Sequence, residues 1–90
     1  MTGLVCAIVG AGEGLGQALA KKFANQGYNI ALISRSLKGS ASAIEAVNKI
    51  GSYVKHFFAD AQNPISIEKA ISNIIDEMGE IEVLIYNVRG

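Results

Sequence analysis

Four short apolar runs divide the chain into segments of helix length. The runs occupy residues 4–9, 30–33, 53–58 and 83–86, and they are rich in β-branched and aromatic side chains. Runs of this length and composition are typical of β-strands, and continuous apolar runs favour strands that are buried on both faces of a parallel sheet. The pattern therefore predicts four buried parallel strands.

The first two intervening segments have the spacing of amphipathic helices. Gly27 and Gly51 follow them, at positions where a glycine in the left-handed conformation can end a helix. Ser40 or Ser42 is the expected amino-terminal cap of the second helix. The apolar faces consist of Leu15, Ala18, Leu19 and Phe23 in the first helix and of Ile44, Val47 and Ile50 in the second.

The third intervening segment carries the best-formed helix signals. Asn63 is a suitable cap, Pro64 suits the first helical position, and Gly79 lies just after the last apolar residue. These signals predict a helix with one continuous face toward the core. That face consists of Ile67, Ile71, Ile74, Ile75 and Met78.

The resulting order of elements is β-α-β-α-β-α-β, which predicts an α/β fold. Right-handed crossovers arrange four such strands as part of a doubly wound parallel sheet with strand order 3-2-1-4. The strand order reverses between the first and fourth strands, and ligands of open α/β sheets bind at the carboxyl ends of the strands beside such a reversal. We therefore expect a ligand site at this edge.

Glycines are concentrated between the first strand and the first helix. Gly10, Gly14 and Gly16 form a G-x-x-x-G-x-G pattern, with Gly12 as an additional glycine inside it. Glycines let backbone N–H groups approach a pyrophosphate, and the following helix presents its positive amino-terminal end to the anion. The segment lacks the Gly-Lys-Ser/Thr ending of a nucleoside-triphosphatase loop, and G-x-G-x-x-G would need glycine at position 15 or 17, where leucine and glutamine stand. The turn predicts dinucleotide binding.

This glycine spacing resembles that of the short-chain dehydrogenase/reductase family. The resemblance covers essentially all 90 residues, which correspond to the amino-terminal, cofactor-binding part of a family member. It implies that residues 1–90 are one partial NAD(P)-binding domain of Rossmann-like fold. Within the turn, the resemblance implies cofactor contacts from Gly10, Gly12, Gly14, Leu15 and Gly16.

Arg35 and Ser36 follow the second strand, near the position where dinucleotide folds place an acidic residue against the adenosine ribose. A guanidinium pairs with a 2′-phosphate through charge-assisted hydrogen bonds, so these residues favour NADP(H) over NAD(H). Lys38 could assist from the same loop. The alternative is that Arg35 is an ordinary solvated loop residue.

Two further segments extend the resemblance. Asp60 and Ala61 end the third strand where the family carries an aspartate beside the adenine, and the alternative for Asp60 is a turn or helix-start residue. After the fourth strand only the second asparagine of the family's Asn-Asn-Ala-Gly signature is present, as Asn87. The resemblance implies that Asn87 first ties the central strands together and second lies near the nicotinamide ribose.

Composition limits the class of protein further. Eight basic and eight acidic residues cancel, so no general electrostatic field attracts nucleic acid or a membrane surface. Cys6 is the single cysteine and lies inside the first apolar run, where a buried thiol is expected. No apolar run approaches the roughly 18 residues of a membrane span, and strand pattern begins almost at Met1, so we expect a cytoplasmic protein.

The chain lacks the catalytic signature that the resemblance would require. No tyrosine is followed four residues later by lysine, and His56, the one histidine, is expected to be structural or solvent-facing. We assign no catalytic residue and no metal ligand. The predicted function is the NADP(H)-binding part of an oxidoreductase that transfers hydride between nicotinamide and a carbonyl or alcohol, with the small-molecule substrate bound only by a longer parent. The alternative is a non-enzymatic nucleotide-binding or interaction module, and in either case the fourth strand is an apolar edge through which the chain could self-associate.

Overall fold

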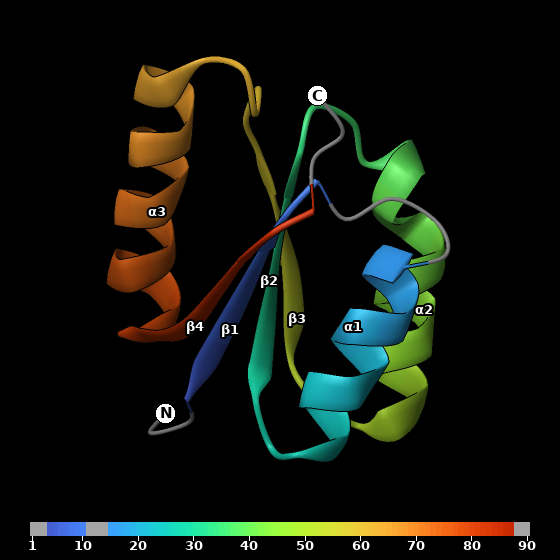
Figure 1. Cartoon of the computed structure of the whole chain (residues 1–90). Helices are drawn as coiled ribbons and strands as arrows, with labels where there is room; N and C mark the ends of the chain where they lie inside the picture. The colour runs from blue at the N-terminus through green and yellow to red at the C-terminus, as the bar shows by residue number, and fades with distance from the viewer. Residues whose placement is uncertain (1–3, 11–14, 88–90) are drawn as a thin grey trace.

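The computed structural model describes residues 4–10 and 15–87. Strands and helices alternate along this part of the chain, as Figure 1 shows. The strands are β1 (Val5–Val9), β2 (Asn29–Ser34), β3 (Val54–Phe58) and β4 (Ile81–Tyr86). The helices are α1 (Leu15–Asn25), the short 3₁₀ helix η1 (Lys38–Ser40), α2 (Ala41–Ile50) and α3 (Pro64–Met78).

The four strands form one parallel sheet with the order β3-β2-β1-β4, which confirms the predicted topology. Val9 at the end of β1 lies opposite Ile33 of β2 and Tyr86 of β4, and Ser34 of β2 lies opposite Phe58 of β3. The carboxyl ends of all four strands therefore meet along one edge of the sheet, at the top of Figure 1. We call this edge the carboxyl edge.

Helices cover both faces of the sheet. α1 and α2 lie on one face and α3 lies on the other (Figure 1). β1 is completely buried, and its side chains alternate between the two layers: Val5, Ala7 and Val9 face α3, whereas Cys6 and Ile8 face α1 and α2. Cys6 has the expected buried position, and the continuous apolar run of β1 is explained by burial on both sides.

The amino terminus of α3 is capped as predicted. Asn63 Oδ1 accepts hydrogen bonds from the backbone nitrogens of Ile65 at 3.0 Å and Ser66 at 3.3 Å, and Pro64 occupies the first helical position. The predicted core face is partly wrong, because Ile75 is 47% exposed and Ala70 is buried in its place. The buried positions of α3 fall on a narrower stripe, at Ile67, Ala70, Ile74 and Met78, since only one side of the helix packs against the sheet.

In the other layer, the buried residues of α1 also differ from those predicted. Ala18 is exposed, whereas Ala20 and Ala24 are buried against the sheet. Ala20 and Ala24 have small side chains, so α1 can lie close to the sheet, and α2 packs beside α1. Gly51 ends α2 as predicted, with φ at 94°, a left-handed conformation that suits glycine. Ser40 does precede α2, but its side chain makes no capping hydrogen bond.

β4 contains one residue more than its partner at the start of the pairing. Val5 pairs with Ile81, but Cys6 pairs with Val83, so the register shifts at Glu82. Ile81 consequently packs in the α3 layer, whereas Val83 and Ile85 pack in the layer of α1 and α2. The shift changes which face each later side chain of β4 occupies.

Candidate functional site at the carboxyl edge of the sheet

Gly10 is the first residue of the turn that follows β1. Its φ is 78°, in the left-handed region that favours glycine, and its backbone nitrogen donates to the carbonyl oxygen of Ile33 at 2.7 Å. The predicted contacts Gly12 and Gly14 lie outside the described residues. Leu15 and Gly16 are the first two residues of α1, and Gly16 is buried. The turn thus joins the carboxyl end of the central strand to the amino terminus of α1.

Asn87 connects β4 to this turn. Its backbone nitrogen donates to the carbonyl oxygen of Val9 at 2.8 Å, and its side-chain Nδ2 donates to the carbonyl oxygen of Gly10 at 3.4 Å. Gly10 is therefore bonded to β2 through its N–H and to the end of β4 through its C=O. These contacts fix the start of the glycine turn relative to three strands.

Arg35 and Ser36 lie in the loop that follows β2, and both are exposed. The hydroxyl of Ser34 donates to the Ser36 carbonyl oxygen at 2.8 Å, which folds the loop back on the end of its strand. Lys38 begins η1 and is also exposed. The loop offers cationic side chains at the same edge as the glycine turn.

Asp60 lies just beyond β3, at the same edge, and is half-buried. The Ala59 nitrogen donates to the Ser34 carbonyl oxygen at 3.0 Å, which extends the pairing of β3 with β2 up to this point. Asp60 Oδ1 accepts from the Gln62 nitrogen at 2.9 Å, and the Asp60 nitrogen donates to Ser66 Oγ at 3.0 Å. The carboxylate therefore stabilises the turn before α3. Ala61 packs against the core on the α3 side.

The side-chain polar atoms of Ser34, Ser40 and His56 form a cluster at the start of the Arg35 loop. Ser34 Oγ is 2.7 Å from His56 Nε2 and 3.1 Å from Ser40 Oγ. Burial lowers the pKa of His56, and the ring stacks edge-on against Phe58 with centroids 4.6 Å apart. The sequence pattern did not reveal Ser34. The parallel register of the structure reveals it, because Leu32 lies opposite His56 and Ser34 and His56 therefore share one face of neighbouring strands.

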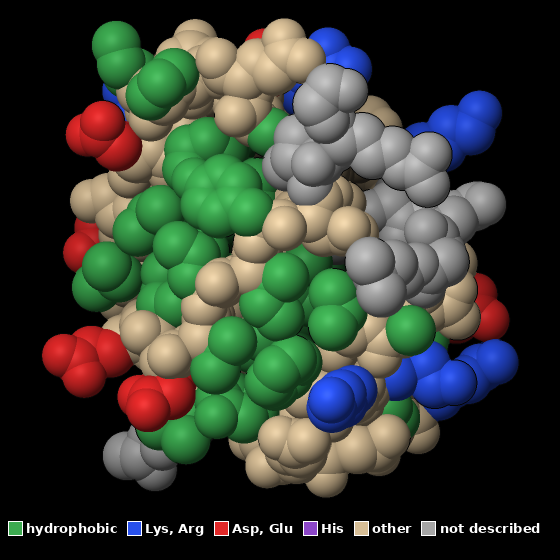
Figure 2. All heavy atoms as spheres, viewed as in Figure 1, with side chains coloured by type: hydrophobic (Ala, Val, Ile, Leu, Met, Phe, Trp, Pro, Cys, Tyr) green, Lys and Arg blue, Asp and Glu red, His purple; other side chains and the backbone are tan. Residues whose placement is uncertain are grey.

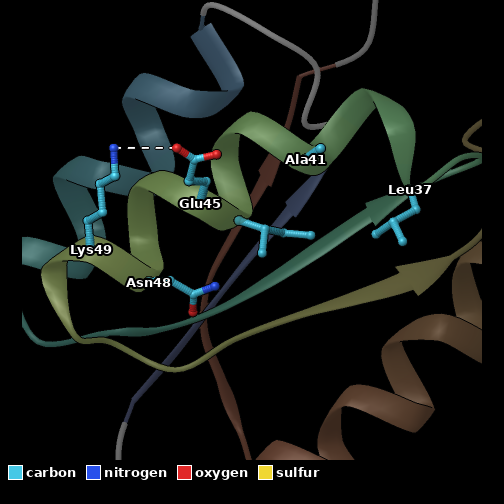
Figure 3. Close-up of a pocket in the computed structure, with 6 residues that line it drawn as sticks. Leu37, Ala41, Glu45, Asn48 and Lys49 are labelled. Carbon is cyan, nitrogen blue, oxygen red and sulfur yellow. Dashed lines mark ion pairs between the residues drawn. The ribbon is translucent and has the colours of Figure 1, made fainter.

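Two further features are a buried thiol and a surface hollow along α2. Burial raises the pKa of the Cys6 thiol to about 11, so it stays protonated at neutral pH. A surface hollow of about 510 Å³ runs along α2, and the ion pair between Lys49 and Glu45 at 3.4 Å closes one rim (Figure 3). The hollow contains none of the predicted cofactor contacts. Its lining consists of Leu37, Ala41, Ile44, Glu45, Asn48 and Lys49.

Within residues 4–10 and 15–87, no helix is long and apolar enough to cross a membrane. The cytoplasmic location stays a prediction.

A family model described as short chain dehydrogenase matches residues 4–89. The chain belongs to the short-chain dehydrogenase family. A short-chain dehydrogenase/reductase of Armillaria gallica is 34% identical over 90 residues, an alignment that covers 94% of this chain and 33% of the relative. The chain thus spans about a third of the length of this relative.

Solved structures of the family show the same arrangement of elements. The L-sorbose reductase of Gluconobacter frateurii, complexed with NADPH and L-sorbose, has a TM-score of 0.85 and 25% identity, covering 100% of this chain and 35% of that one. An NADH-dependent reductase complexed with NAD has a TM-score of 0.84 and 27% identity, covering 98% of this chain and 37% of that one. The predicted family and its Rossmann-like fold are confirmed. Relatives hold either nicotinamide cofactor, so the family alone does not select NADP(H).

Proposed function

We propose that this chain is the NADP(H)-binding part of a short-chain oxidoreductase. The observation that carries the proposal is the order of residues along the carboxyl edge: Gly10 after β1 stands between the Arg35 loop after β2 and Asn87 after β4. This is the crevice in which open α/β sheets bind their ligands. This arrangement supports the proposal, because the start of a turn suited to a pyrophosphate lies on the strand next to the one that carries the cationic loop.

The glycine turn would hold the pyrophosphate. Gly10 has the left-handed conformation that starts such a turn, and α1 begins at Leu15 with its amino terminus at the carboxyl edge. Helix amino termini carry unpaired N–H groups and a partial positive charge, both of which favour a bound phosphate. Gly12 and Gly14 are proposed to leave room for the backbone to approach the cofactor.

The loop after β2 would distinguish NADP(H) from NAD(H). Arg35 and Ser36 are exposed there, and the hydrogen bond from Ser34 to the Ser36 carbonyl fixes the loop close to the strand end. A guanidinium and a hydroxyl are suitable donors for a 2′-phosphate, and the loop contains no carboxylate to pair with ribose hydroxyls. These residues therefore fit the phosphorylated cofactor.

The remaining contacts lie at the two ends of the dinucleotide. Asp60 and Ala61 would border the adenine, although one Asp60 oxygen already accepts from the Gln62 nitrogen. Asn87 would lie beside the nicotinamide ribose while holding Gly10. The bound cofactor supplies hydride transfer. The sequence contains no Tyr-x-x-x-Lys, so proton transfer and the substrate pocket are assigned to a part of the parent enzyme that these residues do not include.

Thermal unfolding of the chain with NADPH and with NADH tests this function. A ligand at about 100 times its dissociation constant adds about 2.7 kcal/mol to stability, so a bound cofactor raises the melting temperature measurably. We expect a larger rise with NADPH than with NADH. A folded sample that responds to neither cofactor would instead support the alternative of a non-enzymatic interaction module.

The exposed side of β4 favours self-association of the isolated chain. β4 is an edge strand that pairs with β1, and its Leu84 and Tyr86 are 44% and 58% exposed. Figure 2 shows apolar side chains gathered along the middle of the face that β4 crosses in Figure 1. Such edges invite pairing with another chain. Sedimentation of the wild type and of Leu84→Lys tests this, because only the wild type should form a concentration-dependent dimer.

A further inference from the structure

Ser34 makes three polar contacts with one hydroxyl group, and their directions are determined by chemistry. The Ser36 carbonyl oxygen, 2.8 Å away, can only accept, so the single proton of Ser34 points to it. The two lone pairs of Ser34 Oγ are then left to accept from Ser40 Oγ and from His56 Nε2. His56 must therefore carry its proton on Nε2.

The other ring nitrogen of His56 gives the same answer independently. Nδ1 is buried and has no hydrogen-bond partner among the described residues. A buried N–H without an acceptor is costly, whereas a buried lone pair on a neutral ring costs less. Both observations select the neutral Nε2–H form, in which every proton of the cluster has an acceptor.

The charged side chains on the elements next to β3 are paired or exposed. Among the described residues, η1 carries Lys38, α2 carries Glu45 and Lys49, which pair with each other, and β3 carries Lys55, which pairs with Glu77 of α3. β2 carries no titratable side chain. Burial of the ring is the cause that lowers the pKa of His56.

We propose that His56 is a positioning residue for cofactor selectivity: its Nε2–H holds Ser34, and Ser34 in turn holds the loop that presents Arg35 and Ser36 to a 2′-phosphate. The proposal rests on the proposed function, because it concerns the same loop. His56 touches no cofactor atom in this arrangement. It acts on NADPH only through the hydrogen bond from Ser34 to the Ser36 carbonyl.

A matched pair of substitutions separates this role from simple packing. Glutamine places its side-chain amide where Nε2 lies and keeps a donor for Ser34, whereas asparagine reaches only to the Nδ1 position. We expect His56→Gln to keep the wild-type ratio of NADPH to NADH affinity. His56→Asn and Ser34→Ala should each lower that ratio about fivefold, the usual effect of losing one hydrogen bond, by weakening NADPH alone. Equal ratios in His56→Gln and His56→Asn would overturn the proposal.

The protonation of His56 can be measured without cofactor. Because the chain has one histidine, long-range ¹H–¹⁵N correlation of the imidazole gives an unambiguous signal. We expect a protonated Nε2 and a bare Nδ1 at pH 7.5, and in Ser34→Ala the Nε2 signal should shift because its hydrogen bond to Ser34 Oγ is gone. A proton on Nδ1 would overturn the hydrogen-bond assignment.

Arg35→Asp keeps this inference distinguishable from the function on which it rests. If Arg35→Asp abolishes the preference for NADPH while Ser34→Ala and His56→Asn leave it unchanged, the proposed function stands and the positioning role is refuted. If the wild type shows no preference for NADPH, both are refuted.

Discussion

The side-chain amide of Asn87 donates to the carbonyl oxygen of Gly10, 77 positions earlier in the chain. This bond ties the end of an edge strand to the start of the glycine turn on the central strand. The turn is therefore supported from the side opposite β2, to which the Gly10 nitrogen is bonded. Its position depends on contacts from both neighbouring strands.

Asn87→Ala should destabilise the chain by about 1 kcal/mol, because it removes the side-chain hydrogen bond and leaves the Gly10 carbonyl with one partner fewer. Urea unfolding of the chain measures the change. Asn48→Ala is the matched control, since Asn48 is an exposed residue of α2. Equal stability of the two variants would contradict a role for the Asn87 bond.

Asn63→Ala should cost about 1 kcal/mol, because Asn63 Oδ1 satisfies two backbone N–H groups at the start of α3. Thermal unfolding followed by circular dichroism provides the measurement. Asn73→Ala, an exposed position within the same helix, should leave stability unchanged or slightly raised. A cost shared by both variants would point to a general effect on α3 and not to the cap.

Arg35→Asp should weaken NADPH binding at least tenfold and NADH binding much less, because a repelling charge replaces the cation that we propose to pair with the 2′-phosphate. Titration with each cofactor gives the two dissociation constants. Lys22→Asp makes the same charge change in the last turn of α1, away from the carboxyl edge. A similar loss of NADPH affinity in both variants would indicate a nonspecific charge effect.

The stability of the fold should fall as the pH drops below the ordinary histidine pKa of about 6.5. Burial lowers the pKa of His56 in the folded state, so the unfolded chain takes up a proton first, and the contribution of neutral His56 is lost as the pH falls toward the folded-state pKa. Above pH 7 both states are neutral and this contribution is fully present. Unfolding free energies of wild type and His56→Gln between pH 5 and 8 should converge toward the acid end. Parallel curves would exclude His56 as the cause.

The fold was predictable from the sequence because its signals are local or periodic. Apolar runs marked the strands, Asn63 and Gly51 marked helix ends, and the right-handed crossover rule gave the strand order. Which helical residues are buried was less predictable, as Ile75 and Ala70 show, because hydrophobicity does not reveal how far a helix rolls on its sheet.

For the candidate site, the sequence pointed only to residues that belong to a recognisable motif. Glycine spacing and the resemblance identified the residues of the carboxyl edge, but Ser34 has no sequence signal of its own. Its importance arises from contacts with residues 6 and 22 positions away. Such contacts exist only once β2, β3 and η1 are assembled, so the support of the Arg35 loop emerges from tertiary structure.

The additional residue in β4 determines from which side the exposed part of that strand can be covered. Before Glu82 the chain directs Ile81 into the α3 layer, and after it Leu84 and Tyr86 occupy the face that Ala7 and Val9 share with α3. Val83 and Ile85, in contrast, already pack in the layer of α1 and α2. Any polypeptide that buries Leu84 and Tyr86, from the same chain or another, has to lie beside α3.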